Sequence, residues 1–295
     1  MPSLDDLKKR IASVKSTEKI TKAMKMVAAA KLRKAQEAAE QSRPYADNMK
    51  SLMDSISKGF NSTDDSKNLL AGDGNDSTYM LVLFTSERGL CGGFNSQISK
   101  TLKEKIIDLK KQNKKVKIIC VGKKGYDIIK RQYGELIVDI IDMSSIKTIQ
   151  YVDAKQISDK IIDMYFNNEF DKCLIFYNKF KSIISQIPTE QQVIPAEMTK
   201  DANSEDTSKD NIFFEFEPNE KEILEELLPL NFAVQIFKAL LESSASEQGS
   251  RMSAMDNASR NASDMIDSLT LFYNRSRQAV ITKELIEIIS GAEAV

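Results

Sequence analysis

Histidine is absent from this sequence of 295 residues. Without it there is no Ser-His-Asp triad, Cys-His dyad, histidine-ligated zinc or imidazole proton shuttle, which leaves an enzyme only rarer carboxylate or lysine chemistries. Cysteine is scarce as well, since Cys91, Cys120 and Cys173 are odd in number and too widely spaced for a metal knuckle or a C-x-x-C pair. We expect three buried free thiols and no catalytic, cofactor-binding or metal-binding residue.

An excess of charge of either sign is also lacking. The 42 basic and 43 acidic side chains leave a formal net charge of −1, which argues against binding to nucleic acid or to an acidic membrane surface. No apolar run approaches the roughly 20 residues that span a bilayer. The start, "MPSLDDLKKRIASV", has neither the layout of a secretion signal nor the composition of a transit peptide. We therefore expect a soluble chain in a reducing compartment.

Residues 1–60 have the periodicity of one long helix, because apolar or small residues recur at steps of three and four. Ser3 is expected to cap its N-terminus, and Pro44 to bend or split it. The predicted seam consists of Leu4, Leu7, Ile11, Val14, Ile20, Met24, Val27, Leu32, Ala35, Ala39, Ser42, Ala46, Met49, Met53, Ile56 and Phe60.

Residues 213–295 repeat this periodicity, with Pro229 and Gly249 as two weak points. The predicted seam consists of Ile223, Leu227, Leu230, Val234, Phe237, Leu241, Ser244, Gln248, Met252, Met255, Ser259, Ala262, Ile266, Leu269, Tyr273, Ser276 and Val280.

Residues 79–195 alternate between strand-like and helix-like segments, which predicts a Rossmann-like α/β domain with a mostly parallel sheet. The strand-like runs are "YMLVLFT", "VKIICVG", "ELIVDII" and "DKCLIFYNKF", and the helices are expected around 98–111, 125–133 and 152–166. The stretch "SIISQIPTEQQVIP" predicts an antiparallel edge strand. Polar residues 61–78 and 196–212 are expected to be a linker and a mobile loop.

The length of the terminal helices predicts how they are covered. A helix of roughly 55 to 70 residues extends about 80 to 105 Å, whereas a compact chain of this size has a radius of gyration of about 19 Å. We expect the two helices to pair as an antiparallel coiled coil that projects from the α/β domain. Their richness in Ala, Ser and Met favours close approach of the helices and contact with a partner over a simple spacer, which would use Leu in the seam.

A glycine-rich segment, "TSERGLCGGFN", follows the first predicted strand. It lacks the G-K-[ST] ending of a phosphate loop and the G-x-G-x-x-G spacing, so a nucleotide site is the weaker interpretation. A structural turn is favoured, with Gly89, Gly92 and Gly93 permitting close packing and Asn95 or Ser96 capping the next helix. Cys91 as a nucleophile is disfavoured because the chain has no imidazole to activate it.

Basic side chains line the first predicted helix from Lys8 to Lys34 with few acidic neighbours. Such a run is normally a solvated face. On a projecting helix, it is also suited to acidic segments of a surrounding partner.

The C-terminal segment "ITKELIEIISGAEAV" resembles the signature of the gamma subunit of F-type ATP synthases. The resemblance extends through "SSASEQGSRMSAMDNASRNA", "LTLFYNRSRQAVITKEL", "RIASVKSTEKITKAMKMVAAAKLRKAQ", "SRPYA" and "SERGLCGGFN", and thus covers most of the chain. It implies a non-catalytic central stalk inside a ring of three alpha and three beta subunits. That stalk couples rotation of the membrane c ring to conformational change at the catalytic sites of the beta subunits.

The resemblance also implies which residues contact partners. Met24 with Lys19, Lys22 and Lys25 is expected to face acidic levers of the beta subunits, and Gly291 to Val295 to reach furthest into the ring. Polar contacts within the ring are expected from Gln248, Arg251, Arg275, Arg277, Gln278, Thr282 and Glu284. Phe214 and Glu215 are expected to contact the c ring and the epsilon (or delta) subunit. The segment "EMTKDANSEDTSKDN" is longer and more acidic than expected for the family. This difference affects how the nearby residues Phe214 and Glu215 align with the family.

This resemblance implies a peripheral position on the cytoplasmic face of a bacterial inner membrane, or on the matrix face of the mitochondrial inner membrane. The Met1 start without a presequence favours the bacterial case or a mature organellar chain. Two alternatives from other classes remain at this stage, which are a nucleotide-binding α/β enzyme and a coiled-coil adaptor.

Overall fold

The computed structural model describes residues 3–59, 69, 72, 74–146, 148–195 and 220–293. The chain divides into two compact units, of which unit 1 combines residues 1–30 with 251–295 and unit 2 comprises residues 31–250. Most of the expected linker 61–78 and all of the expected loop 196–212 lie outside the described residues.

A five-stranded sheet forms the centre of unit 2, in the order β3-β2-β1-β4-β5. The strands are β1 (Thr78–Phe84), β2 (Lys115–Val121), β3 (Ile137–Ile141), β4 (Lys172–Phe180) and β5 (Gln186–Ile194). The first four are parallel, and β5 pairs antiparallel with β4. The mostly parallel sheet and its antiparallel edge strand are thereby confirmed.

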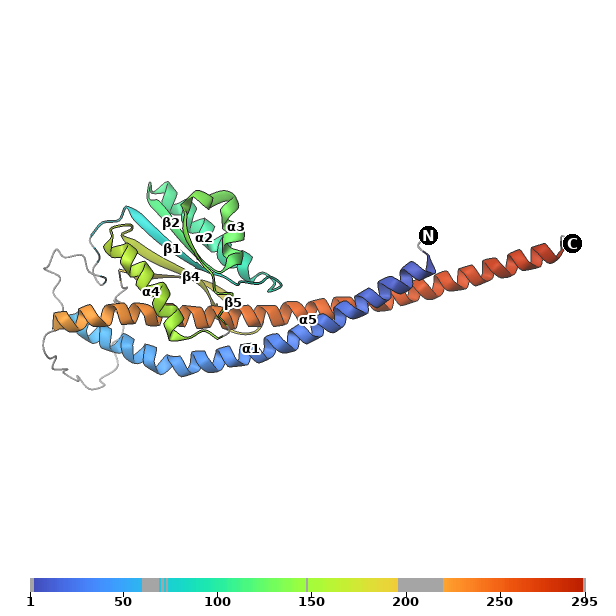
Figure 1. The fold of residues 1–295 in the computed structure, drawn as a ribbon, viewed down its shortest axis with the longest axis horizontal. Coiled ribbons are helices and arrows are strands. Elements are labelled where there is room, and N and C mark those ends of the chain that lie inside the picture. Colours follow the sequence, from blue (N-terminus) through green and yellow to red (C-terminus); the bar gives the residue numbers. More distant parts are fainter. Residues whose placement is uncertain are drawn as a thin grey trace, which may run out of the picture. The chain divides into compact units, whose positions relative to one another are not determined.

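Helices cover both faces of this sheet (Figure 1). They are α2 (Phe94–Lys111), α3 (Lys123–Tyr133) with the 3₁₀ turn η1 (Gly134–Leu136), and α4 (Tyr151–Phe166), close to the three predicted ranges. On the α2 and α3 face, Leu81 and Leu83 pack with Ile98, Leu102 and other buried residues. Burial on both faces explains why β1 and most of β4 are nearly continuous apolar runs, whereas the edge strands β3 and β5 carry exposed side chains.

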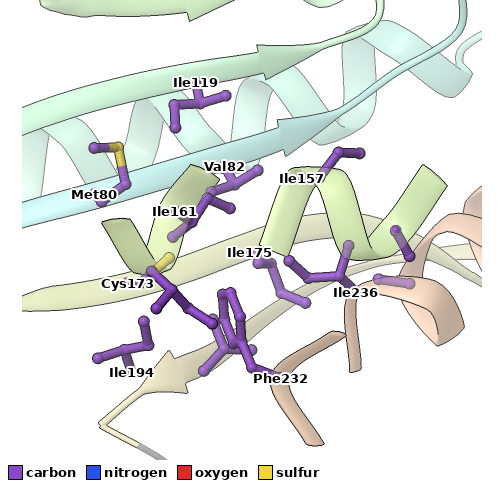
Figure 2. Close-up of a cluster of buried hydrophobic side chains, with 14 of the residues drawn as sticks. Met80, Val82, Ile119, Ile157, Ile161, Cys173, Ile175, Ile194, Phe232 and Ile236 are labelled. Atoms are coloured by element: carbon purple, nitrogen blue, oxygen red, sulfur yellow. The ribbon is translucent and has the colours of Figure 1, made fainter. Parts of the chain in front are cut away.

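The opposite face of the sheet is covered by α4 and by part of the last helix, α5 (Glu220–Glu293). Figure 2 shows Phe232 and Ile236 of α5 next to Ile175 of β4, together with Ile161 of α4. The sequence predicted that the first helix would bury the α5 seam. Within unit 2 this prediction is incomplete, because apolar side chains of α5 also pack into the core of the α/β domain.

The first helix, α1 (Leu4–Gly59), runs through Pro44 without a break, and α5 likewise runs through Pro229. Of the two effects expected of Pro44, a bend or a split, the split is wrong, because the helix continues through this residue; Leu32 and Met49 are buried on either side of it. The predicted N-cap is confirmed, because the Asp6 N–H donates to Ser3 Oγ at 3.1 Å.

In unit 1, α1 packs against α5 as an antiparallel pair, and α5 extends well beyond the start of α1 (Figure 1). The predicted seam is wrong at Ile20 and Val27, which are 58% and 56% exposed, whereas Thr21 and Ala28 are buried in their place. Small side chains in the seam allow the helices to approach closely, which turns the larger neighbours outward.

Two predicted seam positions of α5 are also wrong. Leu230 in unit 2 and Val280 in unit 1 are both exposed.

Candidate partner-binding surfaces

The glycine loop after β1 is filled by its own polar side chains. Asn95 accepts a hydrogen bond from the Ser86 N–H at 3.0 Å and donates to Ser86 Oγ at 2.8 Å and to Cys91 Sγ at 3.2 Å. Asn95 therefore holds the loop together and is not the cap of α2, and Ser96 donates to the carbonyl of Gly93 instead of capping.

Only part of the glycine prediction for this loop is confirmed. Gly92 has a φ of 57°, in the region that favours glycine. A Cβ at Gly89 would meet open space and one at Gly93 only an ordinary contact with Gln97. Leu90 also has a positive φ, 64°, and its side chain is 65% exposed.

All three cysteines are buried and free, as predicted. Burial raises the pKa of Cys120 to about 12 and also raises the pKa of Cys173, so both thiols stay protonated at neutral pH. Thiols in this state are poor nucleophiles.

A second close approach, at the ends of β1 and β2, was missed by sequence reasoning. Gly122 has a φ of 99°, and a Cβ there would lie 2.3 Å from the carbonyl oxygen of Thr85. The hydroxyl of Thr85 accepts from the Gly125 N–H at 2.9 Å. Nearby, Glu87 accepts from the Met143 N–H at 2.7 Å. The "CVGKKG" spacing was the available signal, and the contacts give these groups a structural role.

The basic face of α1 is exposed in unit 1 at Lys19 and Lys22, and Met24 is half-buried. Lys25 forms an ion pair with Asp256 of α5, with 2.5 Å between Nζ and Oδ1. This hydrogen bond to Lys25 is the main cause that holds the pKa of Asp256 below its usual range. Lys25 thus has a partner within the chain, which sequence reasoning did not find.

The remaining predicted contact residues divide into two groups. Gln248 in unit 2 and Arg251 in unit 1 are half-buried on α5. An exposed group near the C-terminal end of α5 consists of Arg275, Arg277, Gln278, Thr282 and Glu284. Phe214 and Glu215 lie outside the described residues.

The last turns of α5 are exposed and apolar. Every described side chain from residue 277 to 292 is exposed. The large apolar ones, which we call the apolar end of α5, are Val280, Ile281, Leu285, Ile286, Ile288 and Ile289. Within the described parts of the chain nothing covers them, and an exposed apolar surface of this kind marks an interaction site.

The fold and these surfaces define a class of protein: an α/β domain joined to a two-helix coiled coil that carries exposed contact surfaces. Residues 3–295 match the profile of the family described as ATP synthase. The ATP synthase gamma chains of Pelagibacter ubique and Sinorhizobium medicae are 58% and 56% identical to this chain, each over 295 residues and the full length of both chains. The chain belongs to the family of ATP synthase gamma chains and is a non-catalytic subunit.

Solved structures agree with this assignment. A chain in the central stalk and c-ring structure of the Tetrahymena thermophila mitochondrial ATP synthase is 29% identical, with a TM-score of 0.60, over 81% of this chain and 99% of that one. A chain of the Euglena gracilis mitochondrial ATP synthase shares the fold at 20% identity, with a TM-score of 0.66, over 99% of this chain and 94% of that one. The stalk interpretation therefore holds over the enzyme and adaptor alternatives. None of the described helices is long and apolar enough to cross a membrane.

Proposed function

We propose that this gamma chain turns as the central stalk of a proton-translocating ATP synthase and couples rotation of the c ring to the catalytic sites of the beta subunits. Its partners are three alpha and three beta subunits, the epsilon (or delta) subunit and the c ring. The observation that carries the proposal is the apolar end of α5, which is exposed around the whole helix. A ring of subunits that encloses this end accounts for its composition.

The charged residues near this end provide the directional contacts. Arg275 and Arg277 are exposed and form no ion pair within the described parts of the chain. Arginine forms strong hydrogen bonds with carboxylates and carbonyls of a partner. Gln278, Thr282 and Glu284 follow on the same helix, and Thr282 already donates to the carbonyl of Gln278 at 2.9 Å.

On α1, exposed Lys19 and Lys22 lie beside the outward-facing Ile20 and Val27. This mixed basic and apolar surface suits acidic levers of the beta subunits, with half-buried Met24 and the paired Lys25 at its edge. On α5, Gln248 and Arg251 are proposed as further polar contacts with the ring.

Because the stalk binds differently to each position of a near-threefold ring, its rotation shifts each beta subunit between conformations. Attachment to the c ring and to the epsilon (or delta) subunit is assigned to Phe214 and Glu215. This attachment makes the chain peripheral to the membrane, on the cytoplasmic face in a bacterium or the matrix face in a mitochondrion.

The test is simultaneous charge reversal, Arg275→Glu with Arg277→Glu, in the assembled enzyme. We expect proton-driven ATP synthesis in membrane vesicles to fall while assembly is retained. The matched control reverses two exposed lysines of the α/β domain, Lys115→Glu with Lys155→Glu, which changes the net charge equally. Normal synthesis in the arginine variant, with normal assembly, contradicts the assignment.

A further inference from the structure

Three buried polar side chains on α5 are bonded to the backbone of the α/β domain, all within unit 2. Glu242 accepts from the Phe180 N–H at 2.9 Å, and Ser246 Oγ donates to the Asn178 carbonyl at 2.8 Å. Ser250 Oγ donates to the carbonyl of Cys91 at 2.7 Å. The exposed fractions of the three α5 residues are 8%, 0% and 9%.

The spacing of these residues follows the helix. Positions 242, 246 and 250 are each four residues apart and so lie along one face of α5. Their targets are the end of β4 and the glycine loop, two segments far apart in the sequence. Asn178 extends the connection, because its Nδ2 donates to the Phe94 carbonyl at the start of α2 at 3.3 Å.

The order of donors and acceptors selects one register. Glu242 presents a carboxylate to an N–H, whereas Ser246 presents a hydroxyl to a carbonyl. If α5 slid by one turn, about 5.4 Å, so that Glu242 took the place of Ser246, the carboxylate would face the Asn178 carbonyl, and two buried acceptors would oppose each other. A slide by one turn the other way would put Ala254 in the place of Ser250 and leave the Cys91 carbonyl without this donor. Buried polar groups without partners are costly, so such a shift is strongly disfavoured.

Gly249 adds a steric component at the same place. A Cβ at this position would lie 3.1 Å from Cε2 of Phe180, closer than an ordinary contact. Because Gly249 has no side chain, the Phe180 ring can pack directly against α5, next to the hydrogen bond from the Phe180 N–H to Glu242.

We propose that Glu242, Ser246 and Ser250 form a hydrogen-bonded lock that holds the α/β domain on α5 in one register and transmits torque between them. Apolar packing is non-directional and resists sliding poorly, whereas buried hydrogen bonds depend on distance and angle. The three side chains are positioning residues and take no part in catalysis. The torque part of the proposal rests on the function proposed above.

The test uses the complete ATP synthase in sealed vesicles and measures protons pumped per ATP hydrolysed. Ser246→Ala with Ser250→Ala removes two bonds of the lock. We expect the pumping ratio to fall by about twofold or more, while ATP hydrolysis by the assembled enzyme continues. Ser244→Ala is the control, since this half-buried serine on the same helix makes no hydrogen bond to the described part of the α/β domain. We expect this control to keep the native pumping ratio.

A second pair of variants separates the hydrogen bond from the packing. Glu242→Gln retains an acceptor for the Phe180 N–H and keeps the ratio, whereas Glu242→Leu loses the acceptor and lowers it. A native ratio in the assembled double variant, or an equal loss in the Ser244→Ala control, overturns the proposal. If the double variant does not assemble, the pumping ratio of the single variant Ser250→Ala is measured instead, and a native ratio again overturns the proposal. Failure of the unsubstituted chain to support any pumping would instead refute the proposed function.

Discussion

Gly249 is the position where helix propensity and packing oppose each other most directly. Alanine in place of glycine stabilises a helix interior by about 0.8 to 1.0 kcal/mol. At 3.1 Å from its Cβ, the Phe180 ring has to move by a few tenths of an ångström, which offsets part of this gain. We expect Gly249→Ala to be within about 1 kcal/mol of the native stability.

Valine at the same position adds two methyl groups. Overpacking of this kind typically costs about 1 to 3 kcal/mol, and valine is also about 0.5 kcal/mol worse than alanine in a helix. Gly249→Val should therefore be about 2 kcal/mol less stable than Gly249→Ala. For a unit of this size that difference lowers the melting temperature by at least about 4 °C.

The assay is thermal unfolding of the purified chain, followed by far-ultraviolet circular dichroism. Gly291 provides the control, because a Cβ there would meet no atom within 4 Å. Valine and alanine at Gly291 should differ by less than about 0.7 kcal/mol, which is the propensity difference alone. If valine and alanine at Gly249 melt at the same temperature, close packing of Phe180 on α5 is refuted.

Two further predictions concern the α/β domain. Gly122→Ala should destabilise the chain by more than about 3 kcal/mol, because its Cβ would lie 2.3 Å from the Thr85 carbonyl oxygen at a φ of 99°. The control Gly134→Ala, where a Cβ would meet nothing within 4 Å, should change stability by less than about 1 kcal/mol. Similar urea midpoints for the two variants would contradict this prediction. The Tyr79 hydroxyl is the main group that lowers the pKa of Asp76, so this carboxylate contributes stability above its ordinary pKa near 4 and loses it as the pH falls further. Because the Asp76 side chain is 43% exposed, Asp76→Asn should cost less than about 1 kcal/mol at pH 7. The urea midpoints of variant and native chain should begin to converge below about pH 4 and go on converging as the pH falls through the lowered pKa of Asp76; a constant difference would exclude the linkage.

The α/β domain could be predicted well because its signals are local. Each of the four parallel strands contains a short apolar run, and each helix between two strands has a polar face and an apolar face. Parallel strands joined by helices allow few arrangements, so the sheet type follows from the order of the segments. The antiparallel β5 follows from the short connection after β4.

Predictions of which neighbouring residue is buried were less successful. Ile20 and Thr21 differ by one position on α1, and hydrophobicity favoured Ile20 for the seam. The structure buries Thr21, because the distance between the two helices decides which side chain fits there. The prediction for Asn95 failed for a similar reason. A capping role is inferred from local sequence, whereas the hydrogen bonds of Asn95 to Ser86 and Cys91 depend on how the loop folds back on itself.

Among the candidate contact residues, sequence reasoning located exposed groups but not their partners within the chain. The charge pattern of α1 indicated a basic surface, and Lys19 and Lys22 are exposed. It did not indicate that Lys25 pairs with Asp256, because a contact across 231 positions leaves no periodic signal. The predicted boundaries of the stalk helices, 1–60 and 213–295, and of the central domain, 79–195, remain predictions.

The sequence by itself determined the two long helices, the α/β domain between them and the absence of histidine chemistry, because periodicity and composition act locally along the chain. Only the tertiary structure decided that α5 belongs to the core of the α/β domain and that Glu242, Ser246 and Ser250 bond to its backbone. Those contacts join residues far apart in sequence, and their free energy depends on distances and angles that no local pattern encodes.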